Sequence, residues 1–518
     1  MKLLGKVGIV SAMTGISRLF GLVREMLMAH FFGTSTLQSA FVIAFRIPNL
    51  FRRLFGEGAL GAAFIPVFAE VEQSEGQAAA QRFFARVMGV LVCVLGFLVG
   101  LGILLTWGVE GWCEETSRWR EAMPLMRIML PYALLICIAA IVSAVLNVRD
   151  RFAVSSLTPV VLNLVWIAVL VGICPFLPAE GYWRIGTVCW GILFAGAAQI
   201  FFQLPELKRV GFQLRFCFSG WKDSPHLRKV LLQMGPASFG IALAQINICV
   251  DGWLAFYGAS WAPSALEYAD RIIYLPLGLF GTAFATVLLP TYSRQVASAN
   301  LSEMVDTLEH ALRTLAVVMA PMALGLMVLA EPIVSLIYQR GAFDQNSVCW
   351  TARAVIAYAP GLLAFSAAKT VVPIFYAFKD LKTPVRVASW CILGNFALNL
   401  LSVLLLPEGW RHVGIAVSTC VNALVNTVIL LTILSRRGIT IHIGALSWVG
   451  IKALLAATLM GGAAYGMYSL LINYLPACFA LMTAIAVGGG AYLLLVALIL
   501  PKTLREVLAD FKFRRKRR

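Results

Sequence analysis

The chain has 518 residues, of which 60% are hydrophobic and only 13% are charged. Soluble proteins carry about 25% charged residues, so the composition excludes a soluble enzyme and indicates a chain that crosses a membrane many times. The net charge of +17 points to membrane topology before nucleic acid, because lysine and arginine collect in the cytoplasmic loops of membrane proteins.

Missing motifs argue against two further classes. None of the 11 cysteines forms a C-x-x-C pair or a cysteine–histidine cluster, which argues against a metal centre. The sequence also contains no G-x-x-x-x-G-K-[ST] loop, so ATP-driven pumping by this chain alone is not expected.

Fourteen segments are long and apolar enough to cross the hydrocarbon core, which takes about 20 helical residues. They are roughly 7–32, 37–69, 87–107, 122–146, 153–174, 185–204, 230–256, 264–292, 314–338, 349–378, 387–406, 412–434, 446–472 and 476–500. The sequence therefore predicts an all-α polytopic membrane protein with about 14 transmembrane helices.

Positive charges divide unevenly between the two sides of these helices. With fourteen spans both termini lie on one side, and that side holds 27 of the 42 lysines and arginines, whereas the opposite loops hold five. The positive-inside rule then places both termini in the cytoplasm. The basic C-terminal residues are interpreted as a stop signal that contacts acidic headgroups.

A short motif recurs after 225 residues. Ser39-Ala40-Phe41 precedes Arg46-Ile47, and Ser264-Ala265-Leu266 precedes Arg271-Ile272. This repeat predicts two six-helix lobes around a central cavity, which is typical of transporters. The predicted domains are an N-terminal lobe (1–204), a basic cytoplasmic linker (205–229), a C-terminal lobe (230–434), two further helices (435–500) and a basic cytoplasmic tail (501–518).

Ten cations lie within the predicted spans. An arginine at mid-membrane costs about 2.5–3.5 kcal/mol on insertion scales, so these side chains must face water or acidic partners. Arg53 and Glu57 can pair on one helix face, and Arg18 shares a face with Glu25. Arg127, Arg353 and Lys452 lie near helix ends, where their side chains can reach the interface. Among the others, four have no obvious acidic neighbour: Arg24, Arg52, Arg271 and Lys369.

Two interpretations of these charges stay open. All of them could form structural salt bridges between helices, or they could line a cationic chamber for an anionic substrate. Arginine suits the second role because its planar guanidinium binds phosphate through two parallel hydrogen bonds.

Two motifs are highly specific: SRLFGLVRE at 17–25 and FRIPNLFRRLF at 45–55. Together with RGAF at 340–343 and KTPV at 382–385, they make the chain resemble the MurJ (MviN) family, the bacterial lipid II flippases of the MOP exporter superfamily. The resemblance covers essentially the whole chain. It implies that a polyprenyl pyrophosphate bearing a disaccharide-pentapeptide is moved across the inner membrane by alternating access.

The resemblance also implies roles for individual residues. The expected substrate-binding residues are Arg18, Arg24, Glu25, Arg52, Arg271 and Lys369, and the expected supporting residues are Ser17, Ser39, Arg53 and Glu57. Ser39 stands where many members of the family have an acid, so a role for that acid is in doubt here. Residues 446–500 are expected to hold the lipid tail, since only Lys452 is charged among them.

Cofactors and partners follow from the same resemblance. Some relatives bind sodium, and the candidate oxygen ligands here are Asp251, Asn395, Asn399 and Thr419. The alternative, ordinary interhelical hydrogen bonding, is favoured for these residues, so no cofactor is required. The expected partners are lipid II, membrane lipids, and proteins of peptidoglycan synthesis and division, with no nucleic acid.

Two other functions stay open from the sequence. The chain could export another polyprenyl-linked sugar, or it could be a non-transporting cell-wall scaffold. A scaffold would not need arginines inside the membrane, and an exporter of cationic drugs would need an acidic cavity in place of a basic one.

Overall fold

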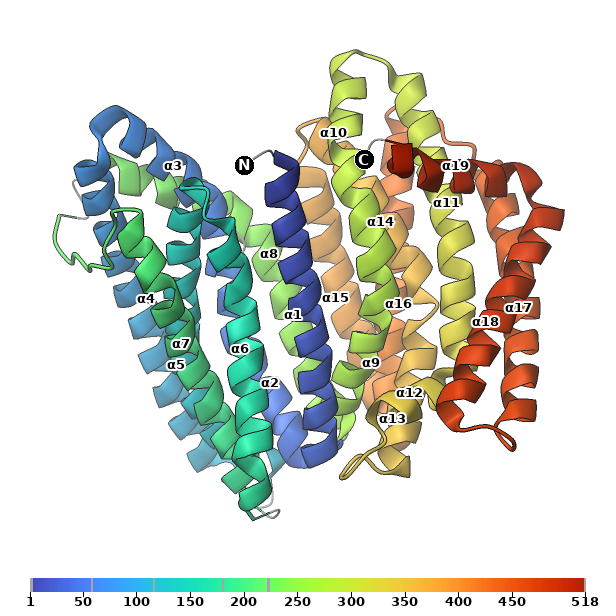
Figure 1. The fold of residues 1–518 in the computed structure, drawn as a ribbon, viewed down its shortest axis with the longest axis horizontal. Helices are drawn as coiled ribbons and strands as arrows, with labels where there is room; N and C mark the ends of the chain where they lie inside the picture. Colours follow the sequence, from blue (N-terminus) through green and yellow to red (C-terminus); the bar gives the residue numbers. More distant parts are fainter. Residues whose placement is uncertain (1–2, 57–58, 115–116, 179–180, 221–223, 517–518) are drawn as a thin grey trace. The chain divides into compact units, whose positions relative to one another are not determined.

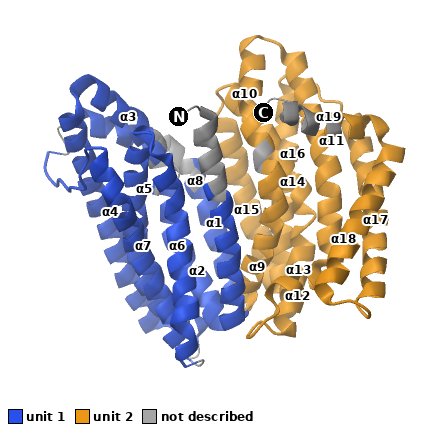
Figure 2. Cartoon of the chain, viewed as in Figure 1, with its two compact units in different colours: residues 1–256 blue, residues 257–518 orange. Residues whose placement is uncertain are grey.

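The computed structural model describes residues 3–56, 59–114, 117–178, 181–220 and 224–516. These residues fold almost entirely into helices (Figure 1), which confirms the all-α prediction for the described part of the chain. Two compact units divide the chain, Met1–Phe256 and Tyr257–Arg518 (Figure 2). The finer domain boundaries proposed from the sequence stay a prediction.

The first unit is built around one central helix. Its helices are α1 (Leu3–Phe32), α2 (Thr36–Phe51), α3 (Ala59–Glu75), α4 (Gln77–Trp112), α5 (Arg118–Val148), α6 (Phe152–Gly172), α7 (Trp183–Arg209) and most of α8 (Pro225–Gly258), with a π-helix, η1 (Arg52–Gly56), and a 3₁₀ turn, η2 (Cys174–Phe176). α5 packs against α2, α4 and α7. The buried residues of α5 lie between Ala122 and Leu146 and are all apolar or aromatic, as expected for a helix in the core of a unit.

The second unit is centred on α14. Its helices are α9 (Ala262–Pro276), α10 (Thr282–Ala297), α11 (Leu301–Val328), α12 (Ala330–Tyr338), α13 (Gln345–Tyr358), α14 (Gly361–Ala377), α15 (Lys382–Leu405), α16 (Glu408–Arg436), α17 (Ile443–Leu471), α18 (Ala477–Ile499) and α19 (Pro501–Lys516), with a π-helix, η3 (Leu277–Gly281). α14 packs against α10, α11 and α16.

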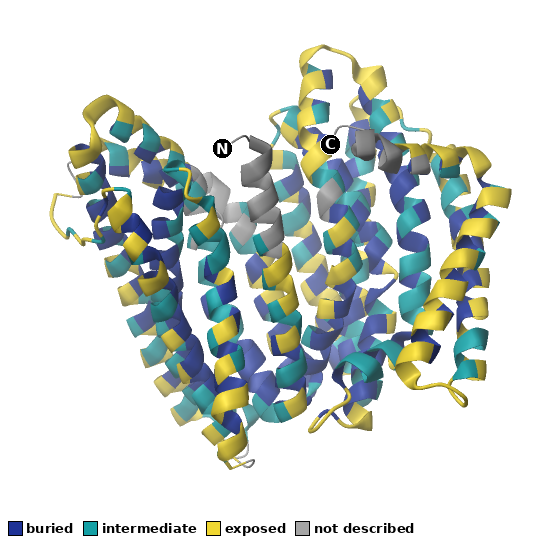
Figure 3. Ribbon diagram, viewed as in Figure 1, coloured by how far each residue is buried: buried dark blue, intermediate teal, exposed yellow. Residues whose placement is uncertain are grey.

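Much of α17 and α18 is exposed (Figure 3). Large apolar side chains such as Leu455, Leu459, Phe479 and Met482 are among the exposed residues. A continuous apolar surface of this kind is expected where helices face lipid rather than water. The chain is therefore a multi-pass membrane protein.

Ten helices in the described residues are long and apolar enough to cross a membrane, or 11 if α13 and α14, which meet at 45°, form one span. Three predicted spans coincide with helices that do not meet this criterion of length and apolar composition: 7–32 with α1, 37–69 with α2 and α3, and 230–256 with α8. The first two predicted spans carry several charges. The count of fourteen stays a prediction.

Several segments expected to be single helices are broken. The span 37–69 consists of α2, the π-helix η1 and α3, and the span 264–292 contains α9, the π-helix η3 and α10. Spans 314–338 and 349–378 are each divided between two helices. Proline lies just before both π-helices, at Pro48 and Pro276, and a helical proline removes a backbone hydrogen bond.

The backbone carries the repeat that the sequence predicts. Arg52 and Leu277, the first residues of the two π-helices, are separated by the same 225 residues as the sequence motif. Each π-helix packs on the central helix of its unit, η1 on α5 and η3 on α14. π-helical turns are rare and occur often at functional sites.

The KTPV motif begins α15 and takes part in a polar cluster with the end of α16. Asp380 accepts hydrogen bonds from the backbone N–H and the hydroxyl of Thr383 at 3.0 and 2.6 Å, and from Arg437 at 2.7 Å. Burial would raise the pKa of Asp380, but these hydrogen bonds and the Arg437 charge outweigh it and lower the pKa to about 2. The carboxylate therefore stays ionised at neutral pH and holds the two helix ends together.

Candidate functional site

Arg24 on α1 is the most completely enclosed of the candidate cations. The residue is only 8% exposed. Its Nη1 donates to Oδ1 of Asn163 on α6 at 3.0 Å, and its Nη2 forms an ion pair with the neighbouring Glu25. The ring of Trp166, also on α6, lies 4.2 Å from the guanidinium carbon. Arg24 thus lies in the contact between α1 and α6, which pack along each other (Figure 1).

The prediction that Arg24 lacks an acidic neighbour is wrong. Consecutive side chains on a helix point about 100° apart, but the long arginine side chain reaches back to the carboxylate of Glu25. The expected partner of Glu25 was Arg18, which lies two turns earlier on the same face of α1. Arg18 is instead exposed, and within the described residues it forms no ion pair.

Asn163 and Trp166 are site residues that the sequence analysis missed. Asn163 also donates from Nδ2 to the carbonyl of Ser17 at 3.2 Å, so Ser17 takes part through its backbone. The indole N–H of Trp166 contacts Sδ of Met28 at 3.4 Å. A buried asparagine in an otherwise apolar span was the available signal, since such residues usually bond across helices.

The other candidates of the first unit lie at the start of the π-helix η1 and on α2. Nε of Arg52 donates to Oδ1 of Asn49 at 2.9 Å, and both Arg52 and Arg53 are half-buried. Ser39 is fully buried on α2. Glu57 lies outside the described residues, so its pairing with Arg53 stays a prediction.

Arg271 of the second unit does have an acidic neighbour, contrary to the prediction. Its Nη2 lies 2.7 Å from Oε1 of Glu267, one helical turn earlier, and its side chain is 44% exposed. The spacing of four residues brings the two side chains together on one face of α9.

Lys369 on α14 is half-buried beside the second π-helix. A Cβ placed on Gly281 in η3 would lie 3.7 Å from Cδ of Lys369. Within the described residues Lys369 forms no ion pair. Each unit therefore has a candidate cation at its π-helix, Arg52 in the first unit and Lys369 in the second.

Other cations within the predicted spans have structural contacts. Arg46 donates to the carbonyl of Ile248 on α8 at 2.7 Å and lies where Gly252 has no side chain. Arg127 pairs with Glu110. Arg353 and Lys452 lie 4.9 and 5.0 Å from the rings of Trp410 and Trp448. The interpretation as salt bridges between helices thus holds for Arg127, whereas the ion pairs of Arg24 and Arg271 each lie within one helix.

The candidate sodium ligands are divided between the units. Asp251 lies in the first unit and accepts from Nδ2 of Asn247 at 3.2 Å. Asn395 and Asn399 are buried on α15 in the second unit, and the hydroxyl of Thr419 on α16 donates to the carbonyl of Ile415 at 3.0 Å. No cluster of three or more histidine, cysteine, aspartate or glutamate residues suited to a metal occurs among the described residues. The sodium site stays a prediction.

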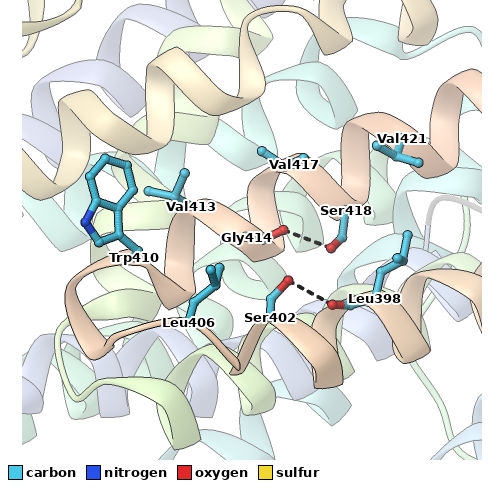
Figure 4. A pocket seen from close by; sticks show the side chains of 9 residues that line it. All are labelled: Leu398, Ser402, Leu406, Trp410, Val413, Gly414, Val417, Ser418 and Val421. Atoms are coloured by element: carbon cyan, nitrogen blue, oxygen red, sulfur yellow. Dashed lines mark hydrogen bonds between the residues drawn. The ribbon is translucent and has the colours of Figure 1, made fainter. Parts of the chain in front are cut away.

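A cavity of about 430 Å³ lies between α15 and α16 (Figure 4). Its polar side chains, Ser402 and Ser418, donate to the carbonyls of Leu398 and Gly414 in their own helices, each at 2.8 Å. The remaining lining is apolar, including Trp410 and Val417. With no charged side chain in its lining, this cavity does not suit a pyrophosphate.

The fold defines the class of protein. A multidrug resistance MATE family transporter of the MOP superfamily, solved in an inward-facing conformation, has a TM-score of 0.67 over 83% of this chain and 95% of that chain. At 13% identity the likeness concerns the fold alone. The chain has the fold of a MOP superfamily transporter.

Sequence comparison then identifies the family. The family model described as lipid II flippase MurJ matches residues 28–485. A probable lipid II flippase MurJ of Vibrio cholerae is 33% identical over 95% of both chains, and the lipid II flippase MurJ of Burkholderia cenocepacia is 34% identical over 83% of both. A structure of lipid II flippase MurJ in an inward closed conformation has a TM-score of 0.76, with 25% identity, over 94% of this chain and 98% of that chain.

The chain belongs to the lipid II flippase MurJ family, a family of transporters and not of enzymes. This confirms the resemblance inferred from the motifs at 17–25 and 45–55.

Proposed function

We propose that this protein moves lipid II from the cytoplasmic to the periplasmic leaflet of the bacterial inner membrane by alternating access. The observation that carries the proposal is a set of cations within the predicted membrane spans of a chain whose relatives are named lipid II flippases. Arg18 and Lys369 form no ion pair within the described residues, and Arg271 keeps nearly half of its side chain exposed.

In this proposal cations within the predicted spans bind the anionic headgroup, and the candidates are Arg18, Arg24, Arg52, Arg271 and Lys369. Arginine suits this role because each guanidinium offers two parallel donors to a phosphate group. Outward movement of the anionic headgroup is favoured by an inside-negative potential, by about 2.3 kcal/mol per charge per 100 mV. The proposal requires no cofactor, and the cell-wall proteins expected as partners stay a prediction.

Depletion of the protein tests this function. Lipid II is expected to accumulate in the inner leaflet, because its headgroup cannot cross the hydrocarbon core unaided. An externally added enzyme that cleaves the lipid II headgroup, applied to spheroplasts, measures the fraction in the outer leaflet. Runs with and without a sodium or proton gradient identify the energy source. Unchanged cleavage after depletion contradicts lipid II transport, and accumulation of a different polyprenyl-linked sugar supports the alternative substrate.

The proposed orientation has both termini in the cytoplasm and predicts the labelling of two cysteines. Cys217 lies against the start of α4, where its N–H donates to the carbonyl of Ala85 at 2.9 Å, and Cys113 follows the other end of α4. At 1.5 Å per residue Ala85 and Cys113 are about 40 Å apart along α4, enough to lie on opposite sides of the membrane.

Single-cysteine variants in a cysteine-free background make this measurable with a membrane-impermeant maleimide. Cys113 is expected to react from outside intact cells, and Cys217 only after the membrane is permeabilised. The reverse pattern contradicts the proposed orientation.

A further inference from the structure

On one edge of the Arg24 guanidinium, only one of the two nitrogen donors has a partner among the described residues. Its Nη1 donates to Asn163, and Nη2 pairs with a single oxygen of Glu25. Nε is buried and has no hydrogen-bond partner among the described residues. Nε and Nη2 form the edge through which an arginine binds an oxyanion by two parallel hydrogen bonds. A buried donor without a partner is costly, so this edge is suited to a ligand that takes both donors.

Asn163 fixes the direction in which this edge points. The residue is 6% exposed, and its amide has a partner on each side: Oδ1 accepts from Arg24, and Nδ2 donates to the carbonyl of Ser17. Both partners lie on α1, two turns apart. The two contacts determine the orientation of the Asn163 amide. Through this amide on α6, the Arg24 guanidinium is linked to the backbone of Ser17 on its own helix.

Trp166 limits the tilt of the same guanidinium. Its ring lies 4.2 Å from the guanidinium carbon of Arg24. The ring is held by Met28 of α1 at its N–H and by edge contacts with Phe41 and Phe45 of α2, whose centroids are 5.6 and 5.4 Å away. The plane of the guanidinium is therefore set by packed side chains of three helices.

We propose that Asn163 is a positioning residue for substrate binding, which holds Nη1 of Arg24 so that the Nε–Nη2 edge is presented to the pyrophosphate. This inference rests on the proposed function. A neutral amide suits the task because it orients the guanidinium without cancelling its charge. An aspartate at this position would place a second carboxylate beside Glu25 and compete with the substrate.

The test is a double-mutant cycle on the full-length protein in lipid nanodiscs, with purified lipid II as the probe. Asn163→Leu is expected to weaken lipid II binding about tenfold or more, as for the loss of one hydrogen bond to a charged group. In an Arg24→Ala background the same substitution is expected to cause no further loss, because the residue it positions is absent. A purely structural role would weaken binding equally in both backgrounds.

Thr158→Ala is the matched control. Thr158 is also buried on α6, but its hydroxyl donates only to the carbonyl of Val154 in the same helix, at 3.2 Å. The Thr158→Ala variant is expected to bind lipid II with the affinity of the wild type. Asn163→Asp is a second variant of unchanged volume, and it is expected to bind lipid II more weakly than the wild type. The melting temperature of each variant without ligand shows whether that variant folds.

Two results would overturn the proposal: wild-type affinity in both Asn163→Leu and Asn163→Asp, or an equal loss from Asn163→Leu with and without Arg24. Failure of the proposed function gives a different result. In that case the wild-type protein does not bind lipid II, or Arg24→Ala leaves its affinity unchanged.

Discussion

Replacement of Arg24, Arg52 or Arg271 by alanine is expected to abolish growth of cells that depend on this protein. Each substitution removes a charge-assisted contact with the pyrophosphate, and such hydrogen bonds contribute about 1.5–3 kcal/mol. Arg271 is 44% exposed and Arg52 is half-buried, so their removal leaves no large cavity. Protein amounts in the membrane are expected to be normal for these two variants.

Arg24 needs a variant that separates binding from stability. Alanine at this position leaves Glu25 buried without its ion pair, and breaking a buried pair is destabilising. Arg24→Lys keeps a positive charge beside Glu25 but cannot form two parallel hydrogen bonds. We expect Arg24→Lys to accumulate normally and to support little growth.

Complementation of a depletion strain, with immunoblots of the membrane fraction, measures these effects. Lys452→Ala is the control, since Lys452 is a cation in α17 that contacts Trp448 and has no place in the proposed site. It is expected to support wild-type growth. Normal growth with all three alanine variants would refute the anion-binding site.

The helices and the repeat were predictable because they follow from local pattern. Long apolar segments indicate the helices. The motif that occurs once with Arg46 and again with Arg271 indicates the 225-residue repeat. The breaks at Arg52–Gly56 and Leu277–Gly281 were not predictable in detail. A π-helix depends on which backbone carbonyl each N–H reaches, and apolar composition does not determine that choice.

The site was predictable in its residue types but not in its partners. Counting acids at helical spacing treated Arg24 as isolated, because it ignored the reach of an arginine to the next residue. Asn163 and Trp166 are about 140 residues from Arg24 along the chain. Their contact with it depends on the packing of α6 against α1, which a single sequence does not reveal. Arg46 likewise donates to a backbone carbonyl of α8. Every residue has a backbone carbonyl, so the pattern of side chains in the sequence does not indicate this contact.

Glu25→Gln is expected to impair growth strongly. Glu25 is 8% exposed and forms an ion pair with Arg24, so the amide would leave that buried guanidinium without a counter-charge. Ser39, which stands where many relatives have an acid, is expected to tolerate alanine, because a hydroxyl contributes about 1 kcal/mol of hydrogen bonding. Complementation by Glu25→Gln and Ser39→Ala, with protein amounts measured alongside, compares the two positions.

Ser39→Asp provides the sharper comparison. A carboxylate at the fully buried position 39 is tolerated only where a cation can pair with it, and Glu25→Gln makes the Arg24 guanidinium available in the same unit. Ser39→Asp is therefore expected to be harmful alone and to restore part of the growth when combined with Glu25→Gln. This pattern would mean that the site needs one acid and that Glu25 supplies it here. If Glu25→Gln supports growth as well as the wild type, the site functions without that acid, and Ser39 marks a true loss of the charge from the mechanism.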